Sequence, residues 1–101
     1  MFIPTEKVVR RTLLLLIAGT RGGIVRLRIL LLLDRKPHNI NELATVLGLD
    51  YKTIQHHMRV LEKAGLVKSS RKAYGNSYLV SDMLKAHKPV MSEIRNMGKS
   101  K

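Results

Sequence analysis

Two helix signals separated by a very short turn constrain this chain most. Asn39 lies three residues before Glu42, the spacing of a capping box, in which two side chains satisfy backbone amides at the start of a helix. Gly48 can take the left-handed conformation that ends this helix, and Asp50 can cap the next one. The spacing therefore predicts two helices joined by a turn of about three residues, which is a helix-turn-helix.

The second of these helices, predicted over 51–64, has two unlike faces. Ile54, Met58 and Leu61 recur at helical spacing and predict a buried stripe, with His57 at its edge. The opposite face carries side chains that can donate hydrogen bonds, namely Lys52, Gln55, His56, Arg59 and Lys63. One face is expected to pack on the core and the other to remain open.

Further elements are predicted on both sides of this pair. Towards the N-terminus, apolar residues predict a helix over 5–18 and another from about 24 to 34, separated by the "GTRGG" run at 19–23. Towards the C-terminus, "LVKSS" and "NSYLVS" alternate as strands do and are joined by 71–75. A last helix over 81–97 contains Pro89, which should interrupt it.

A helix-turn-helix followed at once by a basic hairpin is a winged helix. The predicted fold class is mainly α with a small β-hairpin, a winged helix-turn-helix whose N- and C-terminal helices form a dimer interface. We expect a single domain over 1–101, with an N-terminal dimerisation helix and "GTRGG" turn at 5–23, a winged core at 24–80, a C-terminal dimerisation helix at 81–97 and a tail at 98–101.

The charge of the chain limits its partners. Nineteen Lys and Arg residues stand against 7 Asp and Glu, a formal charge of +12, which indicates nucleic acid or an anionic membrane surface. The leucine-rich runs at 13–19 and 29–33 are shorter than the roughly 20 apolar residues that span a bilayer. We therefore expect no membrane partner and a cytoplasmic, nucleoid-associated protein.

Residues 26–80 resemble the winged-helix domain of the ArsR-type transcriptional regulators, particularly small archaeal-type members. The resemblance lies in "RLRILLLL" at 26–33, "NINELATVLGLDYKTIQHHMRVLEKAGLV" at 39–67 and "YGNSYLVS" at 74–81, and the "GTRGG" run also looks like those members. It implies a homodimeric repressor or regulator that binds double-stranded DNA. In such proteins the terminal helices form the two-fold interface.

The composition of the terminal helices also favours a dimer. The first helix has more apolar surface than a small winged helix covers, and the last carries Met and Ile residues in excess of the core's needs. Two recognition helices related by a two-fold axis would read half-sites about one helical turn apart, roughly 34 Å, in a pseudo-palindromic operator.

Metal sensing by this chain is not expected. Metal-sensing members of the family use cysteines, which are absent here, or Asp, His and Glu ligands in the C-terminal helix. Asp82, His87 and Glu93 superficially resemble the second set, but their spacing differs from the family's and Pro89 interrupts the helix. No metal site, cofactor or effector is evident from the sequence.

The resemblance and the open face together nominate the DNA contacts. The N-terminal residues of a recognition helix reach base edges in the major groove, whereas wing cations meet phosphate or the minor groove. The base-reading candidates are Tyr51, Lys52, Gln55 and His56. Backbone candidates are Thr53, which can instead serve the cap, Arg59, and the hairpin residues Lys68, Arg71 and Lys72.

Other interpretations of these residues exist. Tyr51 can pack on the preceding turn, and the cations can be solvated charges kept for solubility. Catalysis is not expected, because neither His56 nor His57 has a carboxylate placed beside it except Glu62, which falls on another face. A sequence-tolerant architectural chromatin protein is the main alternative function, and a protein-interaction module is a second one that the positive charge disfavours.

Overall fold

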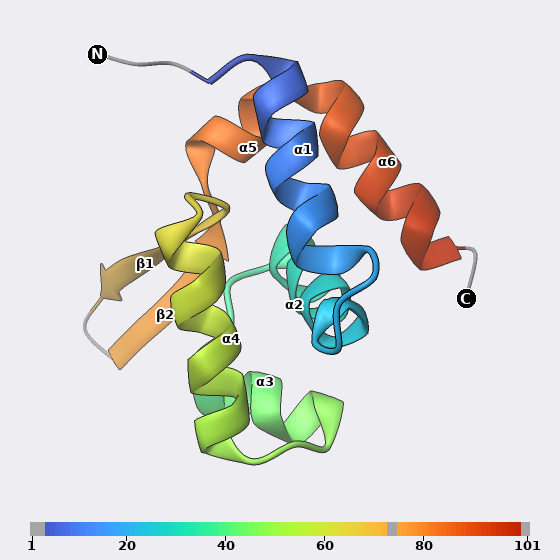
Figure 1. The fold of residues 1–101 in the computed structure, drawn as a ribbon. Helices are drawn as coiled ribbons and strands as arrows, with labels where there is room; N and C mark the ends of the chain where they lie inside the picture. Colours follow the sequence, from blue (N-terminus) through green and yellow to red (C-terminus); the bar gives the residue numbers. More distant parts are fainter. Residues whose placement is uncertain (1–3, 73–74, 100–101) are drawn as a thin grey trace.

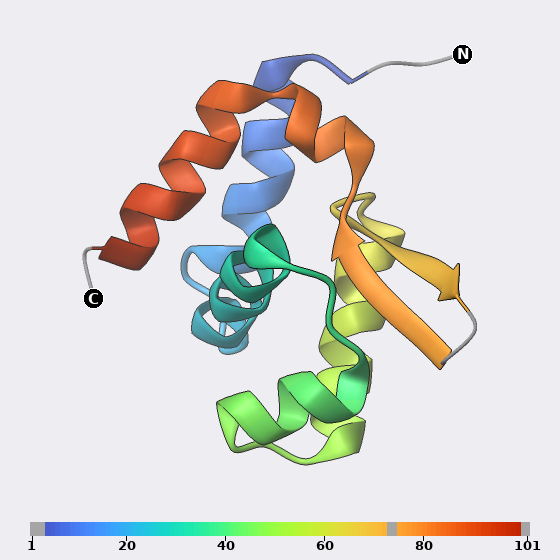
Figure 2. The same cartoon turned by 180° about the vertical axis from the view of Figure 1, so that it is seen from behind.

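The computed structural model describes residues 4–72 and 75–99, and its elements follow the predicted order (Figure 1). Within these residues the elements are α1 Glu6–Ile17, α2 Gly23–Arg35, α3 Ile40–Leu47, α4 Tyr51–Lys63, β1 Val67–Lys72, β2 Gly75–Val80, α5 Asp82–Ala86 and α6 Lys88–Lys99. Helices predominate, and β1 and β2 form a two-stranded hairpin beside α4 (Figure 2). The predicted winged helix-turn-helix is confirmed.

The helix-turn-helix forms through the predicted local contacts. The Asn39 side chain accepts a hydrogen bond from the Glu42 amide, and the Glu42 carboxylate accepts one from the Asn39 amide, both at 2.8 Å. Gly48 ends α3 in the left-handed region with φ 67°, where glycine carries no Cβ penalty. Asp50 then caps α4 by accepting from the Thr53 amide. Local chemistry alone specifies this turn.

The core lies between α2, the helix-turn-helix and the base of the hairpin. Leu30 of α2, Leu43 of α3, and Ile54 and Leu61 of α4 are fully buried, each at 0% exposure. Burying a side chain of this size stabilises the fold by about 1.5–3 kcal/mol. The predicted buried stripe of α4 is confirmed, and its packing fixes which face of that helix remains open.

The hairpin is longer than the sequence pattern indicated. Its antiparallel ladder runs from Val67 opposite Val80 to Lys72 opposite Gly75, so Arg71, Lys72 and Gly75 belong to the strands and not to the predicted connection. An antiparallel hairpin can leave one face open to solvent, so polar residues can belong to its strands.

The segment that precedes α3 also joins the hairpin, which the sequence did not indicate. His38 exchanges two backbone hydrogen bonds with Tyr78 of β2, at 3.1 and 2.8 Å. The start of α3 is thereby attached to the wing. This contact places the polar residues at the beginning of α3 on the same side of the molecule as the open face of α4.

The C-terminal segment is two helices that meet at His87. The predicted interruption is confirmed, although the break precedes Pro89 because proline is tolerated in the first turn of a helix, where its missing N–H costs nothing. The helix α6 continues to Lys99, beyond its predicted end, and 100–101 lie outside the described residues. Gly98 lies close to α2, since a Cβ added there would lie 2.6 Å from a terminal methyl of Leu31.

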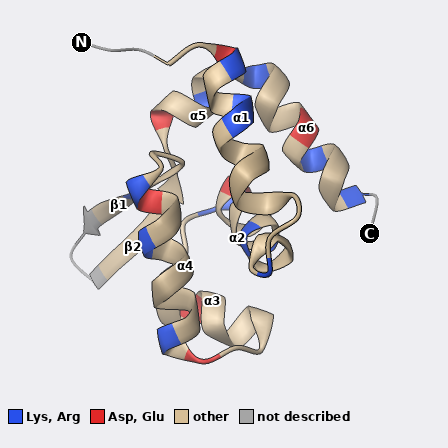
Figure 3. Cartoon of the chain, in the orientation of Figure 1, with Lys and Arg blue, Asp and Glu red and all other residues tan. Residues whose placement is uncertain are grey.

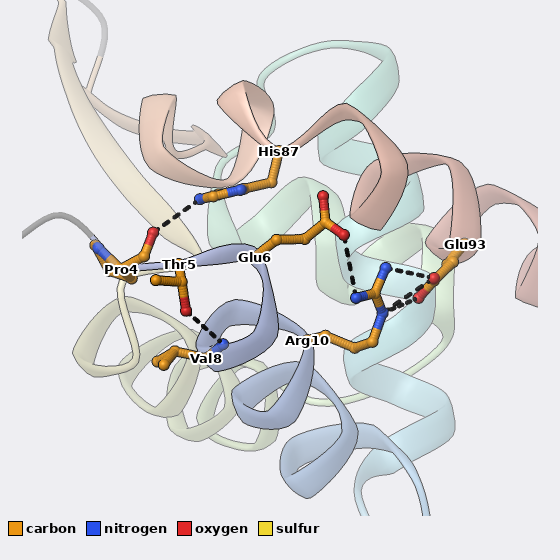
Figure 4. A network of polar contacts seen from close by, with 7 residues as sticks. All are labelled: Pro4, Thr5, Glu6, Val8, Arg10, His87 and Glu93. Carbon is orange, nitrogen blue, oxygen red and sulfur yellow. Dashed lines mark hydrogen bonds and ion pairs between the residues drawn. The ribbon is translucent and has the colours of Figure 1, made fainter.

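Polar contacts fasten α1 to the C-terminal helices (Figure 4). Arg10 donates to both carboxylate oxygens of Glu93, at 2.7 to 3.0 Å, and to Glu6 at 3.3 Å. The hydrogen bond from Arg10 lowers the pKa of Glu93 below its usual value. His87 contacts the Pro4 carbonyl oxygen at 3.2 Å. The orientation of α1 is therefore set by α6 as well as by α2.

The apolar residues of α6 serve the chain's own core. Met91 is 3% exposed and Ile94 is 0% exposed, packed with the residues of α1 and α2. The expectation that these Met and Ile residues are left over from the core is therefore wrong. The outer side of α6 is polar and includes an ion pair from Arg95 to Asp34 of α2 at 2.8 Å.

Candidate nucleic-acid interface

The outer face of α4 carries a row of exposed basic residues, and the Lys and Arg positions of this helix are blue in Figure 3. Lys52, His56, Arg59 and Lys63 are all exposed, at positions i, i+4, i+7 and i+11 of the helix. Among residues 4–72 and 75–99, no carboxylate forms an ion pair with Lys52, Arg59 or Lys63, whereas four ion pairs form elsewhere. The open cationic face that the sequence predicted is present, and its Lys and Arg side chains have no ion-pair partner among the described residues.

A groove of about 520 Å³ runs between this helix and the hairpin. Its lining comes from the start of α3, from α4 and from β2, and consists of Asn39, Ile40, Asn41, Tyr51, Gln55, Met58, Arg59, Asn76 and Tyr78. Most of these side chains are polar, and Arg59 supplies a positive charge. Amide, hydroxyl and guanidinium groups of this kind donate to phosphate and sugar oxygens as well as to base edges.

Gln55 and His56 lie on different sides of the open face. Gln55 lines the groove beside Tyr51 and Arg59, whereas His56 is exposed and does not line it. The His56 ring lies 5.5 Å from the ring of His57, measured between ring centroids. Of the base-reading candidates, Gln55 therefore lies on the side of α4 that faces the groove and His56 lies outside the groove.

Thr53 serves the helix cap. Its hydroxyl donates to the Asp50 side chain, which also accepts from the Thr53 amide at 3.3 Å. These contacts, the hydroxyl first, lower the pKa of Asp50. Of the two roles that the sequence left open for Thr53, the structure shows the cap.

Lys68 is occupied by an ion pair at the base of the hairpin. Its ammonium lies 2.8 Å from a carboxylate oxygen of Asp82 and lowers the pKa of that carboxyl. The backbones of Arg71 and Lys72 lie further along β1, but their side chains are outside what the structure describes. Lys68, one of the three predicted hairpin cations, is thus paired within the chain.

Three asparagines of the groove were not identified from the sequence. Asn41 lies in the first turn of α3, and Asn76 lies opposite Arg71 in the hairpin ladder. Asn39 was recognised only as a cap. An isolated asparagine near a turn looks like ordinary turn chemistry, and only the pairing of His38 with Tyr78 brings these side chains beside α4.

The three residues considered as metal ligands are separately engaged. Asp82 pairs with Lys68, Glu93 with Arg10, and His87 contacts a backbone carbonyl. Within the described ranges, no group of three or more His, Asp or Glu residues is placed to hold a metal ion. In the same part of the chain, no helix is long and apolar enough to cross a membrane.

A second surface of interest lies on α1. Leu15 is 67% exposed, and Val8 and Leu14 are each more than two-fifths exposed. An open groove of about 450 Å³ on this helix is lined by Lys7, Arg10, Arg11, Leu14, Leu15, Ala18 and Thr20. The excess apolar surface predicted for the first helix is confirmed.

The comparisons with known proteins agree with this geometry. A family model described as "Bacterial regulatory protein, arsR family" matches residues 25–69, which contain the helix-turn-helix. No curated protein matches the sequence. Similarity to solved structures is extensive, with low sequence identity throughout.

Three solved structures illustrate the shared fold. Reduced HlyU from Vibrio cholerae superposes with a TM-score of 0.66 at 23% identity, covering 93% of this chain and 86% of that one. The homodimeric winged helix-turn-helix DNA-binding domain of Mb0332 from Mycobacterium bovis gives 0.63 at 22%, covering 86% and 76%. The adhesin competence repressor AdcR from Streptococcus pyogenes gives 0.67 at 17%, covering 89% and 67%.

Proposed function

We propose that this chain is a sequence-specific, double-stranded DNA-binding transcriptional regulator of the small archaeal-type ArsR group, acting as a homodimeric repressor on the cytoplasmic nucleoid. The observation that carries the proposal is the unpaired basic face of α4 beside the polar groove. A helix fits the major groove of B-DNA, and its first turns reach the base edges. In this chain Tyr51, Lys52, Gln55 and His56 occupy those turns.

The groove between α4 and the hairpin suits one strand of the DNA backbone. With α4 in the major groove and the wing on the adjacent minor groove, the phosphodiester strand that separates the two grooves passes between helix and hairpin. Arg59 and Asn76 line that gap from its two sides. Arg71 and Lys72 of β1 add phosphate or minor-groove contacts in this arrangement.

The exposed apolar face of α1 supports a homodimer. A second copy of the chain would cover Leu14 and Leu15, which the monomer leaves in water. A two-fold axis makes such a surface self-complementary and places two α4 helices on one face of a duplex, about 34 Å apart. The solved Mb0332 domain, which has the same fold, is homodimeric.

The salt dependence of binding tests the DNA contacts. Replacing Lys52 and Arg59 together by alanine should weaken binding to every duplex and make the slope of log K against log salt about one unit less steep, because Arg59 is the phosphate contact of the pair and each such contact contributes about 0.9. Fluorescence anisotropy titrations at several salt concentrations measure this slope.

A matched double variant controls for the loss of charge. Lys88 and Lys99 are exposed on α6, away from the hairpin and α4, so their replacement by alanine removes the same two charges. This control should keep the wild-type slope. Equal slopes for both double variants would show that α4 does not meet the phosphates. Equal wild-type affinity for random and selected duplexes would instead favour a sequence-tolerant architectural protein.

A further inference from the structure

The turn between α1 and α2 lies directly against the recognition helix. A Cβ added at Gly22 would lie 2.6 Å from Cε1 of His57, and one added at Gly23 would lie 1.8 Å from the Ile17 carbonyl oxygen. The contact at Gly23 is with backbone, so that position requires glycine on steric grounds, whereas a Cβ at Gly22 would force the His57 ring to shift. These two residues end the "GTRGG" run, whose role the proposed DNA contacts do not explain.

Arg26 connects three helices at this point. Its Nη1 donates to the Leu16 carbonyl oxygen at 3.0 Å, and its Nε donates to Nδ1 of His57 at 3.2 Å. Leu16 lies in the last turn of α1, where carbonyl oxygens have no partner within the helix. The Thr20 hydroxyl also donates to this oxygen, at 3.1 Å. Arg26 of α2 therefore shares the end of α1 with Thr20 and holds the middle of α4 with the same guanidinium.

This contact requires a neutral histidine. A guanidinium has only donors, so Nδ1 of His57 must offer its lone pair and the ring proton must sit on Nε2. The charged or titratable groups that face the ring are Arg26 from α2 and His56 from α4, and both are basic. Within the described residues, no carboxylate pairs with Arg26 or His57. Protonation would replace a hydrogen bond by two adjacent uncompensated cations.

We propose that Arg26 and His57 are positioning residues, which hold the recognition helix at a fixed place relative to α1 only while the His57 ring is neutral. The inference rests on the proposed function. If α1 carries the dimer interface and α4 reads DNA, the link between them sets the separation of the two recognition helices. Breaking the link leaves the DNA-contacting side chains in place but loosens the spacing at which a dimer reads two half-sites.

The direction of the pH effect follows from the surroundings of His57. Burial first, and then the charges of Arg26 and His56, lower the pKa of this ring below its ordinary value of 6.5. The unfolded chain therefore takes up the proton at a higher pH than the folded protein does. The folded ring therefore stays neutral below pH 6.5, and the stability that the contact contributes, complete above about pH 6.5, is lost as the pH falls through the lower folded pKa.

Three variants of the 101-residue chain distinguish a loss of helix positioning from a mere loss of charge and from a loss of folding. Arg26→Met keeps the aliphatic stem and removes the donors, and His57→Asn keeps an acceptor near the position of Nδ1 but cannot titrate. Arg28→Met is the matched control, because Arg28 is exposed on the same helix without a hydrogen-bond or ion-pair partner among the described residues. Thermal melts verify that each variant folds.

The measurement is anisotropy with a selected operator and with duplexes whose half-sites are moved by one or two base pairs, at about pH 7.5 and at a pH below the folded His57 pKa that NMR gives for the wild-type protein. Arg26→Met should bind the operator about tenfold more weakly at the higher pH, as expected when a hydrogen bond to a charged group is lost, and should discriminate less between spacings. Arg28→Met should keep the wild-type spacing preference.

The pH comparison isolates His57. The wild-type preference for one spacing should fall at the lower pH, whereas His57→Asn should retain it. The His57 pKa measured by NMR should rise in Arg26→Met. Wild-type spacing preference in Arg26→Met, or an unchanged acid response in His57→Asn, would overturn the positioning role. A wild-type protein without preference for any duplex would refute the proposed function itself, and the positioning role with it.

Discussion

Replacing Gln55 and His56 together by alanine is expected to lower the preference for a selected operator over random DNA by roughly 10- to 100-fold or more, because each good base contact contributes about 1–3 kcal/mol of discrimination. Gln55 faces the groove and His56 the opposite flank of α4, so the pair samples both sides of the inserted helix. Gln can form two hydrogen bonds with an adenine edge. Binding to random DNA should change little, since it depends on the cations.

The ratio of dissociation constants for selected and scrambled duplexes measures this preference. Lys63→Ala is a suitable control, because Lys63 is exposed two turns beyond His56 on the same face and should affect both duplexes alike. An unchanged ratio in the Gln55 and His56 double variant would show that other side chains read the bases.

Introducing a charge at Leu15 is expected to produce a monomer. Leu15 is 67% exposed in the single chain, so Leu15→Glu costs the monomer little but places a carboxylate in the proposed apolar interface. A monomer loses the second recognition helix of the pair, and operator affinity should fall by about 100-fold or more, the usual scale of bivalent enhancement.

Sedimentation velocity at micromolar concentration and operator titration measure the two effects. Val46→Glu provides the comparison, because Val46 is another exposed apolar residue, at 58%, but lies on α3 and away from α1. It should remain a dimer. A monomeric wild-type protein, or a dimeric Leu15→Glu protein, would contradict the placement of the interface on α1.

The helix-turn-helix could be predicted because its determinants are local. The reciprocal contacts of Asn39 and Glu42, the left-handed Gly48 and the Asp50 cap all act over a few residues, and each appears in the structure as the spacing indicated. The buried and open faces of α4 follow from the same short-range periodicity. Contacts between residues a few positions apart can be predicted when no tertiary contact competes with them, as is the case for these caps and this turn.

Contacts between distant residues could not be predicted. Arg10 and Glu93 are 83 positions apart and Arg26 and His57 are 31 apart, so no spacing rule connects them. Arg26 caps the end of α1, and its second contact, with His57 of α4, depends on the packing of the turn between α1 and α2.

Parts of the candidate interface could not be predicted from the sequence either, because they also depend on contacts between distant residues. The separation of Gln55 from His56 and the inclusion of Asn76 depend on where the hairpin lies beside α4. The pairing of Lys68 with Asp82 depends on how α5 follows β2. Charge and periodicity identify the face that is proposed to meet DNA. The packing of the hairpin and of α5 decides which side chains on that face remain without an intramolecular partner.

Selection from a random pool of duplex DNA tests the central claim most directly. The 101-residue chain should enrich sequences that contain a pseudo-palindrome whose half-site centres lie about 10 to 10.5 base pairs apart, the separation of two recognition helices in a symmetric dimer. Bound DNA that remains as random as the starting pool after repeated rounds would contradict sequence-specific regulation.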